Sequence, residues 1–364
     1  MEKSNWSCAA IDHGVTIFPN GKIAPCCRIK GDYLKPISML ADPNRFADLK
    51  TEYPPSACES CISDECNQLP SYRHQFNSLA TDQPGLQFVD IRNTNLCNLK
   101  CRYCGPHFSN QWAKELGYQH PVVHQDLEPW KSTLITDSLH WLYFTGGEPM
   151  IAHDHWTLLQ ELVDSGQAKD IKLIYNSNLT VTRYKDINIQ DLWSQFKHVN
   201  INCSIDAVGE PLKYIRSGAD WQQIENNLKL LKQFKNISIT LTPVISILNF
   251  WFLPEFLKYA TNEKLAVRPI VLQGPDYLAL DVIPDQLKKT ALAIIDDITV
   301  HLQPNLVIHL RNLIDNNINH VLFSHTVNHI LFLDNQRNEK LFDLLPFKSI
   351  VTDLFIKNYE YEQR

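Results

Sequence analysis

The chain has 364 residues, of which 44% are hydrophobic, and its formal net charge is −6. This length allows two domains with sizeable cores. Because no long run of Lys or Arg is present, the charge pattern does not indicate a nucleic-acid partner. The N-terminus lacks the apolar core of a signal peptide, and no apolar stretch is long enough to span a bilayer, so we expect a cytoplasmic protein without a membrane segment.

Cysteine usage is uneven along the chain. Nine of the ten cysteines lie in the first 104 residues, and only Cys203 lies beyond them. In a chain without an export signal, clustered cysteines bind metals or metal clusters more often than they form disulfides. We expect Cys203 to pack as a small apolar side chain.

The first segment, residues 1–80, is rich in Cys, Pro and turn residues. We interpret it as a small N-terminal domain that a bound metal cluster helps to stabilise. Within it, TIFPNGKIAPCC predicts a hairpin with an Asn-Gly turn and thiols at its base. Gly21 precedes Cys26 at G-x4-C spacing, and the later stretch CESCISDEC adds three more thiols.

From Leu86 onward, short apolar runs alternate with helical patterns such as 153–166 and 221–234. This alternation predicts parallel βα units and an α/β fold, and the six strands over residues 81–282 fit a partial TIM-type barrel, which the resemblance described below identifies as (β/α)6. Chemistry in such barrels sits on the loops that follow the strands. Residues 283–364 are predicted to form a helical C-terminal region. The six predicted strands are 86–91, 140–146, 171–178, 198–206, 237–245 and 265–273.

The loop after the first barrel strand reads CNLKCRYC, which places Cys97, Cys101 and Cys104 at C-x3-C-x2-C spacing. Three thiolates can hold three irons of a [4Fe–4S] cube and leave the fourth iron open for another ligand. Fully cysteine-ligated cubes take four thiolates, and structural zinc sites usually take four ligands. A zinc site that uses His107 as its fourth ligand is the alternative at this loop.

The second barrel strand ends at Thr145-Gly146-Gly147-Glu148-Pro149. The two glycines lack side chains, which suits a backbone that approaches a ligand closely. Glu148 adds a carboxylate acceptor for a positively charged amino group. The fourth strand ends at Cys203-Ser204-Ile205-Asp206, and the pattern R-S-G-A-D-W-x2-I-x2-N follows from Arg216.

Together, the cysteine loop with Tyr103 before its last cysteine, the GGEP turn and the fourth-strand pattern resemble the radical S-adenosylmethionine (radical SAM) superfamily. The resemblance covers roughly residues 86–275 and implies the partial barrel. It implies that a [4Fe–4S] cluster on the three cysteines binds S-adenosylmethionine. A flavodoxin- or ferredoxin-type partner would supply one electron, and the resulting 5′-deoxyadenosyl radical would abstract hydrogen from the substrate.

The resemblance also implies which residues bind S-adenosylmethionine. Gly146, Gly147 and Glu148 would bind the methionyl amino group, and Tyr103 belongs to the same site. Ser204 and Arg216 would bind the methionyl carboxylate, for which a guanidinium is well suited. Asn176 and Asn178 end the third strand and would reach the ribose hydroxyls, although a role in the turn is equally open. Asp206 is expected to be structural.

The N-terminal cysteines resemble the twitch and SPASM domains that bind auxiliary [4Fe–4S] clusters in many radical SAM enzymes. This resemblance covers about residues 5–77, and it differs in that the unit precedes the barrel and lacks the later SPASM cysteines. We therefore expect one auxiliary cluster, and two clusters per chain in total. The expected ligands are Cys8, Cys26, Cys58 and Cys61, with Cys66 or Cys27 as a replacement. Zinc on the same thiols is the alternative.

Three functions remain open on the sequence alone. The first is a radical SAM enzyme that modifies a peptide or protein. The second is a radical SAM dehydrogenase or rearranging enzyme that acts on a small polar metabolite. The third is a zinc-binding interaction module without catalysis. His320, His325 and His329 lie near one another in the C-terminal region, and we assign them no role.

Overall fold

The computed structural model describes residues 7–50, 55–67, 69–315 and 320–345. In this part of the chain the main feature is a nine-stranded sheet. Its strands from β14 to β1 are parallel, and β1, β2 and β3 pair antiparallel. The predicted α/β fold with a partial barrel is confirmed. In spatial order the strands are β14 (Ala266–Val267), β12 (Ile237–Leu241), β10 (His198–Cys203), β7 (Lys172–Ser177), β6 (Trp141–Phe144), β4 (Phe88–Ile91), β1 (Gly14–Ile17), β2 (Lys22–Ala24) and β3 (Lys35–Pro36).

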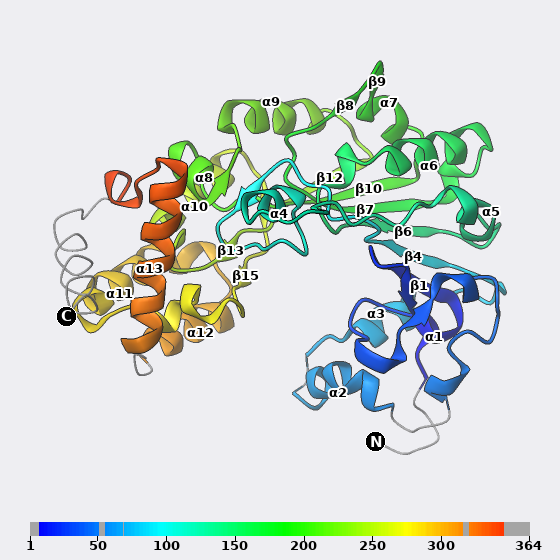
Figure 1. Ribbon diagram of the computed structural model, residues 1–364, viewed down its shortest axis with the longest axis horizontal. Coiled ribbons are helices and arrows are strands. Elements are labelled where there is room, and N and C mark those ends of the chain that lie inside the picture. The colour runs from blue at the N-terminus through cyan, green and yellow to red at the C-terminus, as the bar shows by residue number, and fades with distance from the viewer. Residues whose placement is uncertain (1–6, 51–54, 68, 316–319, 346–364) are drawn as a thin grey trace.

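The two faces of the sheet differ because side chains alternate along each strand. One face carries the buried row Ile91, Phe144, Tyr175 and Ile201, which are aligned by the strand register. Figure 1 shows helices α6 (His153–Asp164), α7 (Ile189–Trp193) and α9 (Trp221–Leu231) above this face. We call the opposite face, which carries Asp90, Tyr143, Ile174 and Asn200, the inner face.

The N-terminal hairpin extends the barrel sheet. Its turn at Asn20-Gly21 has a left-handed glycine, as the Asn-Gly signal predicts, and Thr16 of β1 lies opposite Asp90 of β4. Helices α1 (Ala9–His13) and α3 (Tyr72–Leu79) contact each other beneath the inner face. The ring of Phe76 lies 5.2 Å from that of Phe88, between ring centroids. The parallel pairing of β1 with β4 was not predicted.

The described part of the C-terminal region, residues 283–315 and 320–345, is mostly helical, as predicted, and the prediction for residues 316–319 and 346–364 lies outside the described residues. The described part contains α11 (Asp285–Ile298), α12 (Pro304–Asp315) and α13 (His320–Arg337). Figure 1 shows these helices together at one end of the molecule, beyond β13 and β15. In the part of the chain that the structure describes, no helix combines the length and the apolar character needed to cross a membrane.

Helix α13 and the residues after it are bound to the cysteine loop by ion pairs. The fully buried guanidinium of Arg102 lies 2.7 Å from the carboxylate of Asp334 and 2.6 Å from that of Glu339. Arg337 at the end of α13 pairs with Glu115 at 2.7 Å. Burying charges in this way is costly unless each has a partner. The C-terminal region therefore supports the loop from outside the barrel.

We predict that Arg102→Met lowers the free energy of unfolding by about 3–5 kcal/mol, because it leaves the Asp334 carboxylate buried without its cation. Urea unfolding followed by fluorescence measures this change. Arg183→Met is the control, because Arg183 is exposed and its pairing with Asp186 spans 3.8 Å, so its effect should stay within about 0.5 kcal/mol. Equal effects of the two substitutions would show that the buried ion pairs do not hold the loop.

Candidate functional site

The cysteine loop follows β4 and is held by the short helix α4 (Asn110–Glu115). The backbone N–H of Cys97 donates to Asn110 Oδ1 at 2.9 Å. Trp112 Nε1 donates to the carbonyl of Cys101 at 2.8 Å. Cys101 is buried, whereas Cys97 and Cys104 are partly exposed. The backbone of the loop is therefore fixed at its first two cysteines, while Cys97 and Cys104 remain partly exposed.

A two-residue ladder brings Arg216 to this loop. Strand β5 (Lys100–Cys101) pairs antiparallel with β11 (Arg216–Ser217), and Arg216 lies opposite Cys101. Its Nη1 lies 3.7 Å from Cys101 Sγ, and its Nε lies 2.7 Å from Asp206 Oδ2. Tyr103 donates its hydroxyl proton to the same Asp206 oxygen at 2.6 Å. The structure thus places Arg216 and Tyr103 beside the cysteines, with the fully buried Asp206 joining them.

The three thiols of the loop lie in an environment that disfavours free thiolates. Burial raises the pKa of Cys97 to about 12, and it raises the pKa of Cys101 and Cys104 as well. Arg216 acts in the opposite direction on all three. A positively charged metal centre would supply the remaining compensation, since metal binding deprotonates its thiol ligands. The donor chemistry of the loop therefore fits an iron–sulfur cluster.

Zinc on the thiols is the alternative to an iron–sulfur cluster at both cysteine groups. Zn–S bonds of about 2.3 Å in a tetrahedron put sulfur atoms about 3.8 Å apart. Among the described residues, the only three or more potential ligands within 4.8 Å of one another are His124, Asp126 and Asp154, which include no cysteine. Neither cysteine group has three thiols at zinc spacing, and His107 does not complete such a set.

The GGEP turn lies directly against the cysteine loop. A Cβ on Gly147 would lie 1.9 Å from the carbonyl oxygen of Leu96, and Gly146 adopts a φ of +104° beside the carbonyl of Thr94. The N–H of Glu148 donates to the Leu96 carbonyl at 2.6 Å. The glycines were expected to let the backbone approach a ligand. In the structure they let two loops approach each other, which orients Glu148 relative to Cys97.

Glu148 has a buried carboxylate held by three donors. It accepts from Ser177 Oγ at 2.9 Å, from the N–H of Asn178 at 2.7 Å and from the N–H of Met150 at 3.3 Å. Burial raises its pKa to about 7, although these hydrogen bonds favour the charged form. The side chain of Asn178 bonds to Asn98 and Thr180, which is the turn role that the sequence left open.

Polar side chains form a row on the inner face, near the ends of neighbouring strands. Asn176 Nδ2 lies 3.5 Å from Thr145 Oγ1, Asn202 Nδ2 donates to Asn176 Oδ1 at 2.9 Å, and Arg268 donates to Asn202 at 2.8 Å. Ser204 follows Asn202 by two residues and is also partly exposed. Sequence reasoning missed Asn202 and Arg268. Strand alternation back from Ser204 would have found Asn202.

The four N-terminal cysteines expected as ligands lie together. The thiols of Cys26 and Cys58 are each close enough to those of Cys8 and Cys61 for their thiolate charges to repel one another. Burial raises the pKa of Cys8 to about 11 and that of Cys58 to about 12. The two replacement candidates differ in their surroundings. Cys66 is exposed, and the thiol of Cys27 interacts with Cys26 as well as with Arg92 and Asp90.

Comparison with known proteins supports the assignment of the barrel. The family model of the radical SAM superfamily matches residues 91–260. A GTP 3′,8-cyclase of Campylobacter lari is 24% identical over 129 residues, which are 35% of this chain and 37% of the relative. A 7-carboxy-7-deazaguanine synthase of Thermoplasma acidophilum is 26% identical over 113 residues, 30% of this chain and 47% of the relative. The chain thus spans less than half of the length of these two curated relatives.

Solved structures include similar chains at low identity. The protein anSMEcpe with bound AdoMet is 18% identical, with a TM-score of 0.40, over 69% of this chain and 63% of its own. SuiB of Streptococcus suis bound to S-adenosylmethionine is 13% identical, with a TM-score of 0.35, over 79% and 68%. The family match over residues 91–260, with the cysteine loop and the GGEP turn inside it, supports membership of this chain in the radical SAM superfamily.

Proposed function

We propose that this chain is a radical SAM enzyme that modifies a peptide or protein. The observation that carries the radical SAM part is the loop of three cysteines, fixed against both Arg216 and the GGEP turn. A cluster bound there, together with S-adenosylmethionine, would supply a 5′-deoxyadenosyl radical that abstracts hydrogen from the substrate. The protein's own contribution is to bind and orient the reactants and to exclude water.

The arrangement around the cysteine loop supports the proposed contacts of Glu148 and Arg216 with S-adenosylmethionine. Glu148 is oriented by its three donors and keeps an acceptor for the methionyl amino group beside the cysteine loop. Arg216 and Ser204 would bind the methionyl carboxylate, and Asn176, on the adjacent polar row, would bind the ribose. Arg216 also pairs with Asp206, so this carboxylate would share a guanidinium that is already held in place.

We propose an auxiliary [4Fe–4S] cluster on Cys8, Cys26, Cys58 and Cys61, in a twitch-like N-terminal unit. The gathering of these thiols supports it. Cys8 and Cys26 also pack against the cluster of buried side chains that contains Phe88 and Trp141 of the sheet. An auxiliary centre at this position would lie near the inner face, where it would accept an electron from the substrate or bind it.

The two candidate functions differ in their substrate. A polypeptide is favoured by the exposed apolar surface on segment 106–123, described below. A small molecule is favoured by the sequence relatives, whose names specify GTP and a deazaguanine. Mass spectrometry of candidate substrates after turnover would distinguish the two. A flavodoxin- or ferredoxin-type reductant and a cytoplasmic location complete the proposal.

The metal content tests the two proposed clusters. Anaerobic reconstitution should give about eight irons and eight sulfides per chain, because each cube holds four of each. Cys58→Ala with Cys61→Ala should lower this to about four irons, whereas Cys66→Ala, at an exposed cysteine outside the group, should leave it at about eight. Stoichiometric zinc with about four irons would remove the auxiliary cluster, and iron loss in Cys66→Ala would revise its ligands.

Cofactor cleavage tests the radical site. The reduced enzyme should convert S-adenosylmethionine to 5′-deoxyadenosine, and Cys101→Ala should abolish this. Glu148→Gln keeps the shape but removes the charge, and should weaken cofactor binding by about tenfold or more. Glu128→Gln is the control, because that carboxylate is exposed on the surface. Full cleavage by Cys101→Ala would refute the assignment of the cysteine loop.

A third prediction separates the functions of the two centres. The Cys58→Ala, Cys61→Ala variant should keep uncoupled formation of 5′-deoxyadenosine, because cleavage needs only the cysteine loop and bound cofactor. Its turnover of the true substrate should fail. Circular dichroism and limited proteolysis must accompany the assay, since a small metal-dependent unit can unfold without its metal. A folded variant that forms product at the wild-type rate would show that the auxiliary centre is only structural.

A further inference from the structure

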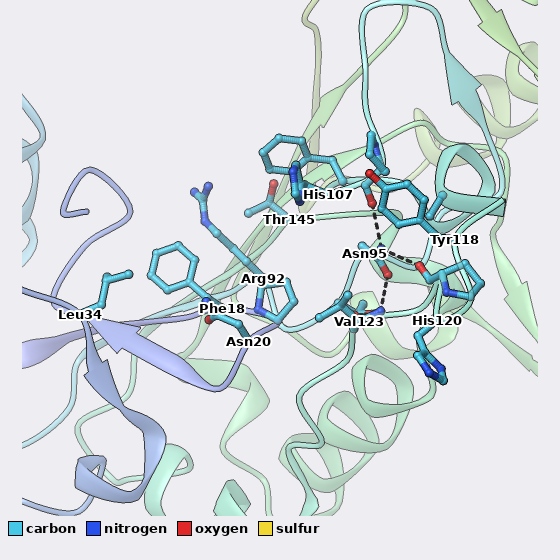
Figure 2. Close-up of a pocket in the computed structure, with 17 residues that line it drawn as sticks. Phe18, Asn20, Leu34, Arg92, Asn95, His107, Tyr118, His120, Val123 and Thr145 are labelled. Atoms are coloured by element: carbon cyan, nitrogen blue, oxygen red, sulfur yellow. Dashed lines mark hydrogen bonds between the residues drawn. The ribbon is translucent and has the colours of Figure 1, made fainter. Parts of the chain in front are cut away.

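A cavity of about 400 Å³ lies between the N-terminal hairpin and the segment that follows the cysteine loop. Figure 2 shows Phe18, Asn20 and Leu34 on one side of it, and His107, Tyr118 and Val123 on the other. The size lies near the lower end of the range of about 300–1,000 Å³ that ligand pockets span. The cavity therefore suits a small ligand or one large side chain.

This cavity adjoins the proposed cofactor site. Thr145 and Gly146 belong to its lining and directly precede Gly147 and Glu148. The hydroxyl of Thr145 also lies 3.5 Å from Asn176 Nδ2, at the end of the polar row on the inner face. A group bound in the cavity would thus lie beside the residues proposed to hold S-adenosylmethionine.

Several polar side chains in the lining form hydrogen bonds with the backbone of the cavity wall. Asn95 accepts from the N–H of Val123 at 2.8 Å and donates to the carbonyls of Pro106 and Pro121 at 3.1 and 2.9 Å. Thr94 Oγ1 donates to the carbonyl of Val123 at 3.3 Å. These groups keep the segment in place. They leave the rings of Phe18, Phe108 and Tyr118 as the large surfaces that a ligand would contact.

The charge of the lining limits what can bind. Arg92 is the only Lys or Arg in the lining, and it is paired with the buried carboxylate of Asp90 at 2.9 Å. A triphosphate requires several cationic or N–H donors for its charges. Among the lining residues only Arg92 carries a permanent positive charge, and His107, His120 and Asn20 offer side-chain N–H donors. The aromatic walls of the cavity instead suit an uncharged aromatic group, which packs favourably against other rings.

The segment that lines one side of the cavity also carries exposed apolar side chains. Phe108, Leu116 and Tyr118 are 64%, 46% and 50% exposed, and Val122 and Val123 on the same segment are exposed as well. We call these five residues the 108–123 patch. Single exposed apolar residues are common, but several on one segment indicate an interaction site. A small metabolite inside the cavity would not cover side chains outside it, such as Leu116 and Val122.

We propose that the cavity receives an aromatic side chain of a polypeptide substrate, whose neighbouring residues lie on the 108–123 patch. This inference rests on the proposed function, because it places the substrate beside the radical site. The aromatic ring would lie among Phe18, Phe108 and Tyr118. The residues on either side of it in the substrate would contact Leu116 and Val122.

Calorimetry of the iron-loaded, unreduced protein tests this inference without relying on activity. The probes are Ac-Gly-Val-Phe-Val-Gly-amide, the same peptide with Ala in place of Phe, N-acetylphenylalanine amide and GTP. The Phe peptide should bind about tenfold or more tightly than the Ala peptide, because the ring buries apolar area, and more tightly than N-acetylphenylalanine amide. GTP should not compete with it.

Single substitutions test where the Phe peptide binds on the protein. Phe108→Ser should weaken the Phe peptide about tenfold. Leu116→Ser should weaken the peptide but not N-acetylphenylalanine amide, because Leu116 lies outside the cavity lining. Val300→Ser is the matched control, since Val300 is 84% exposed and is not part of the lining, and it should change nothing. Circular dichroism verifies that each variant is folded.

Four results would overturn the inference. These are the absence of binding by every aromatic probe at ~10 mM, equal affinity for the Phe and Ala peptides, equal affinity for the Phe peptide and N-acetylphenylalanine amide, and binding of GTP that depends on Phe108. Cleavage of S-adenosylmethionine by the wild-type protein is measured separately. A chain that cleaves the cofactor but binds no peptide contradicts only this inference, whereas one that binds the peptide without cleavage contradicts the proposed function.

Discussion

The close contact between the loops that follow β4 and β6 determines the geometry of the candidate site. The backbone at Gly147 leaves no space for a Cβ beside the Leu96 carbonyl, so any other residue would force the two loops apart. Cys97 directly follows Leu96 in one of these loops, and Glu148 belongs to the other. The distance between the proposed cluster and the proposed amino-group acceptor is therefore set by a backbone contact that only glycine allows.

Buried charge supports this geometry on the opposite side of the cysteine loop. Asp206 joins Tyr103 and Arg216, and the Arg216 ladder fixes Cys101. Farther out, Arg102 pairs with two carboxylates from the C-terminal region. Such pairs are costly to form in a protein interior, and breaking one is more costly still. The cysteine loop thus lies between charged contacts on two sides. A metal centre would compensate the negative charge of its buried thiolates.

Much of the barrel could be predicted from local sequence patterns. Each of the six predicted strand segments contains an observed strand, because buried apolar runs and period-two alternation are local signals. The cysteine loop and the GGEP turn were correctly placed after the first and second strands for the same reason. Cys8, Cys26, Cys58 and Cys61 lie near one another in the structure, and their role as cluster ligands, which the resemblance to twitch domains implies, stays a prediction.

What the sequence did not reveal depends on contacts between distant segments. The pairing of β1 with β4 joins residues about 74 positions apart, and the partners of Arg102 lie 232 and 237 positions away from it. No local sequence pattern indicates contacts between segments so far apart in the chain. The packing of Gly147 against the Leu96 carbonyl was not predicted either, since sequence shows that a backbone is unobstructed but not which group approaches it. The cavity could not be predicted for the same reason, because its two walls come from distant parts of the chain, the hairpin and segment 106–123.

Electron paramagnetic resonance tests the central claim, that the cysteine loop carries an iron–sulfur cluster with one open iron. The Cys58→Ala, Cys61→Ala variant removes the auxiliary signal, so the reduced protein reports on the remaining cluster alone. Because S-adenosylmethionine would bind the open iron, its addition should change the g-values of that signal. A spectrum that stays the same at saturating cofactor would contradict the account.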